Sequence, residues 1–159
     1  MSTGLLQCLW AFLATAGFAV VFKAPLRDLP VAAAGGALAW GVCLLAQTAS
    51  GSEAMAYLVA SIAVGLYAET AAALLKRPAT LFILCAIIPL VPGGGMYYTM
   101  FETVSGKGDL AAAMGFRTLI LAGSIAAGLA IASAIARIFI MEGISLLRPW
   151  PFPRAGKRP

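Results

Sequence analysis

The sequence contains no histidine, and only 11% of its 159 residues are charged. Without histidine, and without a cluster of acidic residues, it has no side-chain set typical of a metal site or of acid–base catalysis. It also lacks the Gly-x-x-x-x-Gly-Lys-Ser/Thr motif that cradles nucleotide phosphates. We therefore expect a protein that is not an enzyme and that has neither a metal nor another cofactor.

Cysteine is scarce as well. Cys8, Cys43 and Cys85 all lie in apolar runs, without the close spacing of a zinc site or a disulfide framework. We expect them to be small buried side chains. The net charge of +5 does not indicate a nucleic-acid partner, because the lysines and arginines are scattered singly or in pairs between apolar runs.

Hydrophobic residues, by contrast, make up 62% of the chain, and the mean hydropathy is +0.95. Apolar runs long enough to cross the hydrocarbon core occupy residues 4–22, 31–47, 54–75, 79–104 and 110–140. This pattern predicts an all-α integral membrane protein with five transmembrane helices in a domain of residues 1–147. The basic, proline-rich tail at 148–159 is expected to be disordered. No Lys or Arg precedes the first run, so we interpret it as a retained helix, not a cleaved signal.

Each connection between the runs has its own helix-ending chemistry. Residues 23–30 combine charge with two prolines, and residues 48–53 form a small polar turn. Lys-Arg-Pro at 76–78 ends the third run. After the turn at 105–109, Asp109 is predicted to cap the fifth helix.

Lys and Arg lie mainly on one side of these five spans. The first connection carries Lys23 and Arg27, the third carries Lys76 and Arg77, and the second has none. The C-terminal flank adds five more: Arg137, Arg148, Arg154, Lys157 and Arg158. The positive-inside rule therefore predicts an N-terminus outside the cytoplasm and a cytoplasmic C-terminus.

Small residues recur in the second and fifth runs at a spacing that allows close helix contact. They are Gly35, Gly36, Gly41, Gly123, Ser124, Ala127 and Gly128. Two interpretations are open: packing within the chain, or contact between copies in a homo-oligomer. A bundle of five small helices is thin for enclosing a polar path, which favours a partner or extra copies.

The fourth run contains Ile87-Ile88-Pro89-Leu90-Val91-Pro92-Gly93-Gly94-Gly95, with two prolines and three glycines. Pro89 and Pro92 have no amide to give the carbonyls of Cys85 and Ile88, so both acceptors should be released near the bilayer midplane. Backbone freed at that depth must be buried in protein or line a cavity. A proline kink that only shapes the bundle is the alternative, but two prolines with a triple glycine favour a substrate site.

Such a site has a definite chemistry. Amides at the start of a second half-helix attract a carboxylate, and freed carbonyls attract an ammonium group or a small cation. Tyr97, Tyr98 and Thr99 would add hydroxyl groups. The pattern therefore predicts a path for a zwitterionic amino acid or another small carboxylate. The candidate residues are Cys85, Ile88, Pro89, Pro92, Gly93, Gly94, Gly95, Tyr97, Tyr98 and Thr99.

Three charged residues in or near the spans are candidates for coupling. Glu69 lies within the third run, where a carboxylate is costly unless it is paired, protonated or facing water. It is consistent either with proton coupling or with a structural pair to Lys76. Arg117 is placed to hold a substrate carboxylate or an acidic group of a partner, and Glu102 is placed to neutralise it. Snorkelling of both side chains to the membrane surface is the alternative.

The chain resembles the small membrane subunit of the threonine/serine exporter family, whose two-component relatives include a succinate exporter. The resemblance rests on Gly-Phe-Ala-Val-Val-Phe-Lys-Ala-Pro at residues 17–25 and on the Pro-x-x-Pro-Gly motif within residues 88–93, and it covers about residues 5–145. Carried over by position, the motif assigns Pro89, Pro92 and Gly93.

The resemblance implies that the chain corresponds to the C-terminal five-span half of the exporter. It implies a larger partner subunit with five spans of its own and a soluble cytoplasmic segment. The expected function is export of threonine, serine or a related small carboxylate, driven by proton exchange or by the membrane potential. The alternative is a scaffold subunit that only stabilises such a partner.

Overall fold

The computed structural model describes residues 2–138, and within them every regular element is a helix. Helix α1 covers Ser2–Val21, α2 covers Leu29–Ser50 and α3 covers Glu53–Leu75. The fourth apolar run is divided into α4 (Ala79–Ala86), the short 3-10 helix η1 (Ile88–Leu90) and α5 (Gly93–Val104). Helix α6 covers Gly108–Ala136. The predicted tail lies outside the described residues, as does the end of the fifth run.

Four of these helices, α1, α2, α3 and α6, are long and apolar enough to cross a membrane. The α4–η1 segment and α5 pass the same test together, with a bend of 55° between them. The prediction of all-helical structure is confirmed for the described residues. The number of candidate spans is four, or five when the bent pair is counted as one span.

The helix boundaries correct two predictions about the connections. Pro30 was expected to break the chain, but it lies in the first turn of α2, where its missing amide costs no helical hydrogen bond. Asp109 was expected to cap the last helix. That helix instead begins at Gly108 after Lys107, without a side-chain cap, and Asp109 lies in its first turn.

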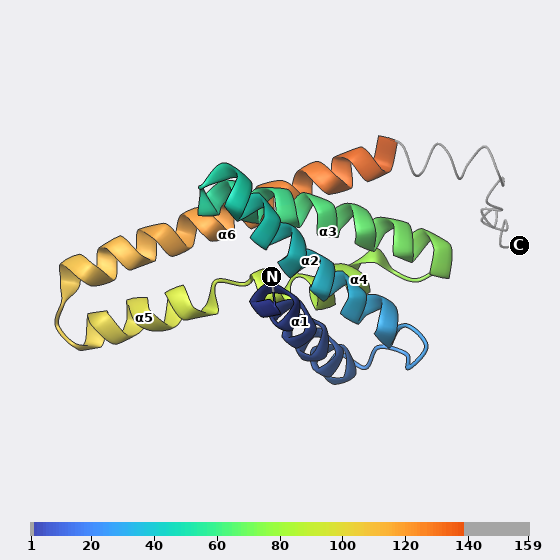
Figure 1. Cartoon of the computed structure of the whole chain (residues 1–159), viewed down its shortest axis with the longest axis horizontal. Coiled ribbons are helices and arrows are strands. Elements are labelled where there is room, and N and C mark those ends of the chain that lie inside the picture. The colour runs from blue at the N-terminus through green and yellow to red at the C-terminus, as the bar shows by residue number, and fades with distance from the viewer. Residues whose placement is uncertain (1, 139–159) are drawn as a thin grey trace, which may run out of the picture.

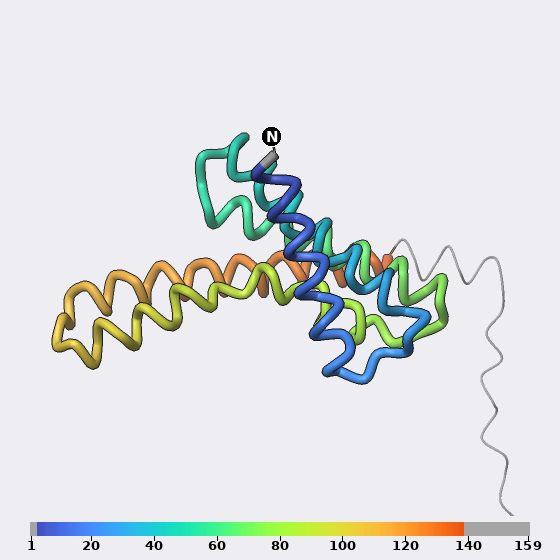
Figure 2. Tube along the Cα trace, turned by 60° about the horizontal axis from the view of Figure 1, so that its bottom comes forward, coloured from blue at the N-terminus to red at the C-terminus, as the bar shows by residue number. Residues whose placement is uncertain are grey.

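The molecule consists of a bundle and a projecting arm (Figure 1). The bundle contains α1 to α4 with the C-terminal half of α6, which packs along α3. The arm, as we define it, is α5 together with residues 108–119 of α6. These two segments run side by side away from the bundle in both Figure 1 and Figure 2.

The bundle core is made mostly of alanine, which lets helix backbones approach closely. One buried cluster centres on Phe82 and Cys85 with six alanines, and a second centres on Val64, Cys43 and Leu90. Cys43 and Cys85 are buried as predicted, while Cys8 is only half-buried. Larger apolar side chains lie outside, which suits helices whose outer surface contacts lipid.

The predicted small-residue contacts occur within the chain for three of the glycines. A side chain on Gly35 would collide with Ala86 and Tyr67, and one on Gly36 would collide with Thr15. A side chain on Gly128 would collide with Ser61 and with the Leu58 carbonyl. Gly123, on the same helix as Gly128, faces open space. Packing within the chain therefore explains Gly35, Gly36 and Gly128.

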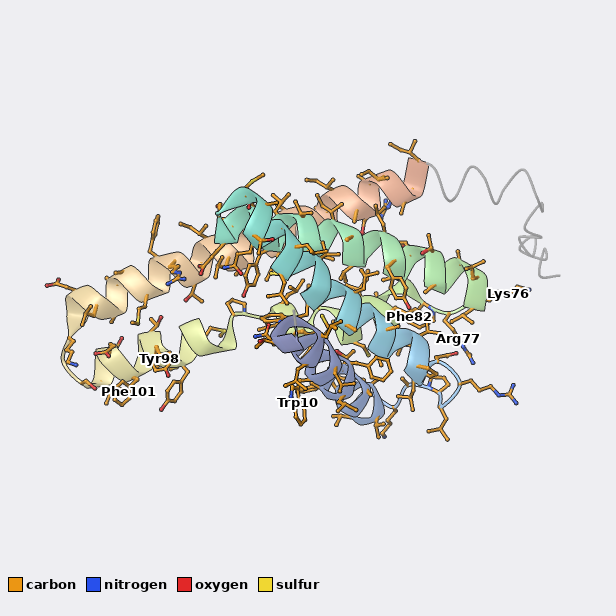
Figure 3. All side chains as sticks on the ribbon, viewed as in Figure 1. Trp10, Lys76, Arg77, Phe82, Tyr98 and Phe101 are labelled. Carbon is orange, nitrogen blue, oxygen red and sulfur yellow. The ribbon has the colours of Figure 1, made fainter. Side chains whose placement is uncertain are left out.

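The first and third connections meet at one end of the bundle. Arg77 Nε lies 3.0 Å from Asp28 Oδ2, and the Asp28 side chain is only 6% exposed. Lys23 and Lys76 both adopt left-handed backbone at the adjacent helix ends. In Figure 3, Lys76 and Arg77 lie at this end, whereas Tyr98 and Phe101 lie on the arm at the other end. The basic residues of these two connections thus lie at one end of the bundle.

Candidate functional site

A hollow of about 440 Å³ opens where the arm leaves the bundle. One wall is the break between η1 and α5, and it comprises Pro89, Val91, Pro92, Gly93, Gly94 and Gly95. The polar side chains of the hollow come from four helices: Gln47, Glu53, Tyr57, Tyr98, Arg117 and Thr118. The volume falls within the range of small-molecule sites.

The break is held by tight turns, and this corrects one prediction. Ile88 was expected to have a free carbonyl, but this oxygen accepts the Val91 amide at 3.2 Å. The Ile87 amide at the end of α4 points to the Cys85 carbonyl, but it donates its hydrogen bond to the Ile83 carbonyl at 3.0 Å. Leu90 is fully buried beneath the turn. The prolines therefore redirect the chain through a 3-10 turn that recovers the Ile88 acceptor locally.

The amides at the start of α5 are only partly engaged in hydrogen bonds. Gly93 donates to the Val91 carbonyl at 2.7 Å and Met96 donates to the Pro92 carbonyl at 3.1 Å. Within the described residues, the amides of Gly94 and Gly95 have no partner, because Pro92 provides no side-chain cap. Both glycines line the hollow. A side chain on Gly94 would meet open space, so this backbone is accessible to a ligand.

Gly95 and Thr99 instead join α5 to α6. A Cβ on Gly95 would overlap Thr118 Oγ1, and a Cβ on Gly115 would lie 3.2 Å from Thr99 Cγ2. Each helix thus places a threonine against a glycine of the other. Thr99 Oγ1 donates to the Gly95 carbonyl at 2.7 Å, so this hydroxyl is already bonded to the backbone of its own helix.

An ion pair crosses the hollow from α3 to α6. Arg117 Nε donates to Glu53 Oε2 at 2.9 Å, and Arg117 Nη2 also contacts Glu53 Oε1. This two-point arrangement is the strongest geometry available to a guanidinium and a carboxylate. Arg117 was expected to be neutralised by Glu102, and that is wrong: Glu102 pairs with Lys107 at 3.4 Å at the tip of the arm.

The structure gathers some of the predicted residues and leaves others out. The hollow includes Pro89, Pro92, Gly93, Gly94, Gly95, Tyr98 and Arg117. The predicted residues outside its lining are Cys85, Ile88, Tyr97, Thr99, Glu69 and Glu102. Glu69 is half-buried on α3, and in the described part of the chain no ion pair joins it to Lys76.

Sequence reasoning missed Glu53 and Tyr57. Glu53 had been assigned to a connecting turn, whereas it is the first residue of α3. Tyr57 lies one helical turn further along, so both side chains lie on the face toward the hollow. The signal for Glu53 was present, because an arginine within an apolar run needs an acidic partner.

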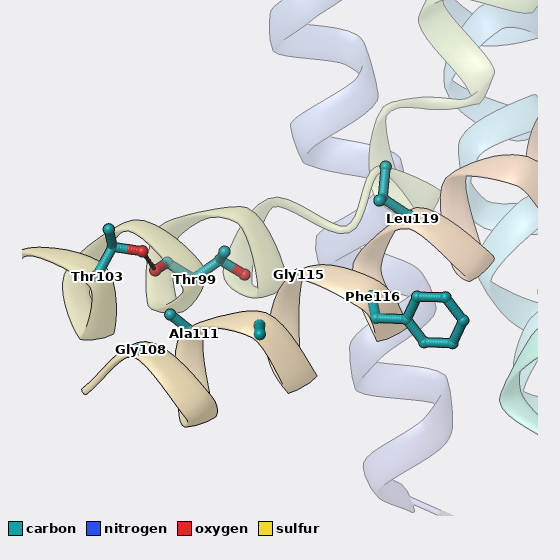
Figure 4. Close-up of a pocket in the computed structure, with 8 residues that line it drawn as sticks. Thr99, Thr103, Gly108, Ala111, Gly115, Phe116 and Leu119 are labelled. Atoms are coloured by element: carbon teal, nitrogen blue, oxygen red, sulfur yellow. Dashed lines mark hydrogen bonds between the residues drawn. The ribbon is translucent and has the colours of Figure 1, made fainter.

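A second hollow, of about 490 Å³, lies between α5 and α6 along the arm (Figure 4). Its lining includes Thr99, Gly115, Phe116 and Leu119 and contains no charged side chain. The hydroxyl of Thr103 is bonded to the Thr99 carbonyl at 2.7 Å. This groove offers a ligand few polar contacts, so the charged hollow is the better candidate site.

Long apolar helices, an alanine-rich core and a charged hollow beside a broken helix define a multi-pass membrane protein whose polar site suits transport. The chain belongs to the threonine/serine exporter family: residues 7–135 match the family described as Threonine/Serine exporter, ThrE. This is a family of transporters and not of enzymes. No solved structure matches the chain.

Proposed function

We propose that this protein is a subunit of a secondary exporter that moves threonine, serine or a related small carboxylate out of a bacterial cell. The observation that carries the proposal is the hollow at the broken helix, where free glycine amides and an ion pair line one small cavity. Family membership supports an amino-acid exporter subunit. We propose the bacterial inner membrane as its location, with the N-terminus outside and the C-terminus in the cytoplasm.

The substrate path in this proposal runs through the break. Gly93 and Gly94 face open space, so a ligand can approach their backbone without displacing a side chain. A carboxylate bound there would accept hydrogen bonds from the amides at the start of α5 and would be favoured by the helix dipole. The hydroxyl of Tyr98 is available on the same wall for a polar substrate side chain.

The arm supports the proposal of a larger partner subunit. No residue of α5 is buried, and Tyr97, Met100 and Phe101 are more than half exposed. Among the described residues α5 packs mainly on α6, so its remaining faces are open to lipid or to another subunit. We propose that the five-span partner implied by the family resemblance completes the hollow on this side. A homo-oligomer is the alternative arrangement.

Export assays with both subunits test the function. We expect Gly93→Leu or Pro92→Leu to abolish threonine efflux, because either side chain would fill or distort the break. Gly123→Leu is the matched control, since it also faces open space but lies outside the hollow. Efflux that is unchanged in both break variants would remove the break from the transport path.

A scaffold role is the second candidate, and the unpartnered arm is the observation that favours it. The two subunits would be reconstituted separately and together in vesicles loaded with labelled threonine. Residual flux through the larger subunit alone would support a scaffold. A strict requirement for this chain, together with loss of flux in Gly93→Leu, would support a direct role in the path.

A further inference from the structure

The charged hollow contains one carboxylate and one guanidinium, and they neutralise each other. The Glu53 and Arg117 side chains are 37% and 68% exposed, so a ligand in the hollow can contact both without any helix moving. Their hydrogen bonds link the start of α3 to the middle of α6. A ligand that replaced this contact would have to supply both a negative and a positive group.

The donors for a carboxylate come from α5 and α6, and the acceptor comes from α3. Gly95 packs directly against Thr118, the neighbour of Arg117 on α6, and the glycines at the start of α5 line the same hollow as Arg117. Glu53 lines this hollow from α3. The hollow therefore brings together hydrogen-bond donors from two helices and a single acidic acceptor from a third.

Charge balance then selects the ligand. A zwitterion brings one charge of each sign, so each half of the ion pair exchanges its partner for an equivalent one. A dicarboxylate brings a second negative charge, which would lie against Glu53 with its positive partner already engaged. Only the zwitterion leaves every charged group in the hollow paired.

We propose that Glu53 and Arg117 are the specificity-determining residues of this hollow. Their ion pair opens to bind a zwitterionic α-amino acid, with its carboxylate on Arg117 and the α5 amides and its ammonium group on Glu53. Glu53 thereby excludes dicarboxylates. The inference rests on the proposed transport function, and it deepens that function by assigning the choice between the two substrate classes to one side chain.

The test compares three ligands that each carry a carboxylate and that present a different group to Glu53. The full chain, with any subunits that co-purify, is placed in lipid nanodiscs, and the binding of threonine, N-acetylthreonine and succinate is measured by calorimetry. N-acetylthreonine keeps the carboxylate and loses the ammonium charge. We expect the wild type to prefer threonine over N-acetylthreonine by about tenfold or more, the size of one hydrogen bond to a charged group.

Glu53→Gln should reduce that preference to near one, and it should admit succinate. Glu53→Asp keeps the charge and should retain the preference for threonine. Asp109→Asn is the matched control, because it removes an exposed carboxylate outside the hollow. Melting temperatures of all variants show whether each one folds.

Two results would overturn the inference: a full threonine preference in Glu53→Gln, or wild-type protein that binds none of the three ligands. Labelled-threonine flux, measured in parallel, separates this inference from the proposed function. Binding that depends on Glu53 without flux supports the inference and contradicts the exporter. Flux with unchanged selectivity in Glu53→Gln supports the exporter and contradicts the inference.

Discussion

The contact between Gly95 and Thr118 gives the sharpest prediction about stability. A methyl group at position 95 would overlap Thr118 Oγ1, and the Cβ and Cγ2 atoms of Thr118 are only 3.4 Å from the same point. Rotation of Thr118 gives little relief, because one alternative rotamer brings Cγ2 into the space of Oγ1 and both alternatives break the 2.7 Å bond from Oγ1 to the Met114 carbonyl. In Gly95→Ala the two helices must therefore move apart.

The expected cost follows from two opposing terms. Overpacking a close contact costs about 1–3 kcal/mol, and alanine in place of glycine within a helix returns up to about 1 kcal/mol. We therefore expect Gly95→Ala to lower the free energy of unfolding by about 1–2 kcal/mol. Gly94→Ala adds the same methyl group one residue earlier, where it meets open space, and should be neutral or stabilising.

The assay is reversible unfolding of the purified chain in mixed micelles, followed by circular dichroism. Thr118→Ala removes the overlapping hydroxyl, so Gly95→Ala should cost much less in that background. Thr118→Val keeps a methyl group in the place of the hydroxyl, so Gly95→Ala should lower the free energy of unfolding as much in that background as in the wild type. The reasoning would be refuted if Gly95→Ala were as stable as Gly94→Ala. It would also be refuted if Gly95→Ala lowered the free energy of unfolding equally in Thr118→Ala and in Thr118→Val.

Three further predictions address the rest of the chain. Asp28→Ala removes the carboxylate that meets Arg77 and should destabilise the protein by about 1–3 kcal/mol in the same unfolding assay; wild-type stability would show that this contact adds nothing. Glu69→Gln should flatten the pH dependence of threonine efflux, and a normal pH profile would remove Glu69 from proton coupling. The topology can be tested in a chain without its native cysteines. There, Ser52→Cys should react with an impermeant thiol reagent in intact cells, whereas Arg27→Cys should react only after permeabilisation. The reverse pattern would contradict the proposed topology.

Much of the helical layout follows from the sequence, because hydrocarbon forces backbone groups to bond within one segment. The predicted run at 31–47 corresponds to α2 at Leu29–Ser50, and the run at 54–75 corresponds to α3 at Glu53–Leu75. The start of α5 at Gly93 was also predictable, since prolines end one helix and a glycine run permits another.

The composition of the candidate site was less predictable. Arg117 and Glu53 are 64 positions apart, and their pairing depends on how α6 lies along α3. A sequence indicates that a charge in an apolar run needs a partner, but not which one, so Glu102 was an equally reasonable choice before the helices were placed. The Ile88 carbonyl was mispredicted for a different reason, because a 3-10 turn supplied a local donor.

The length of α6 makes the arrangement of the helices in this protein sensitive to bilayer thickness. Its 29 residues extend about 43 Å at 1.5 Å per residue, against a hydrocarbon core of about 30 Å. A helix that long must tilt strongly or emerge from the bilayer. Because the glycine–threonine contacts fix α5 to α6, a change in tilt also displaces the start of α5. The width of the opening of the hollow should therefore differ between thicker and thinner membranes.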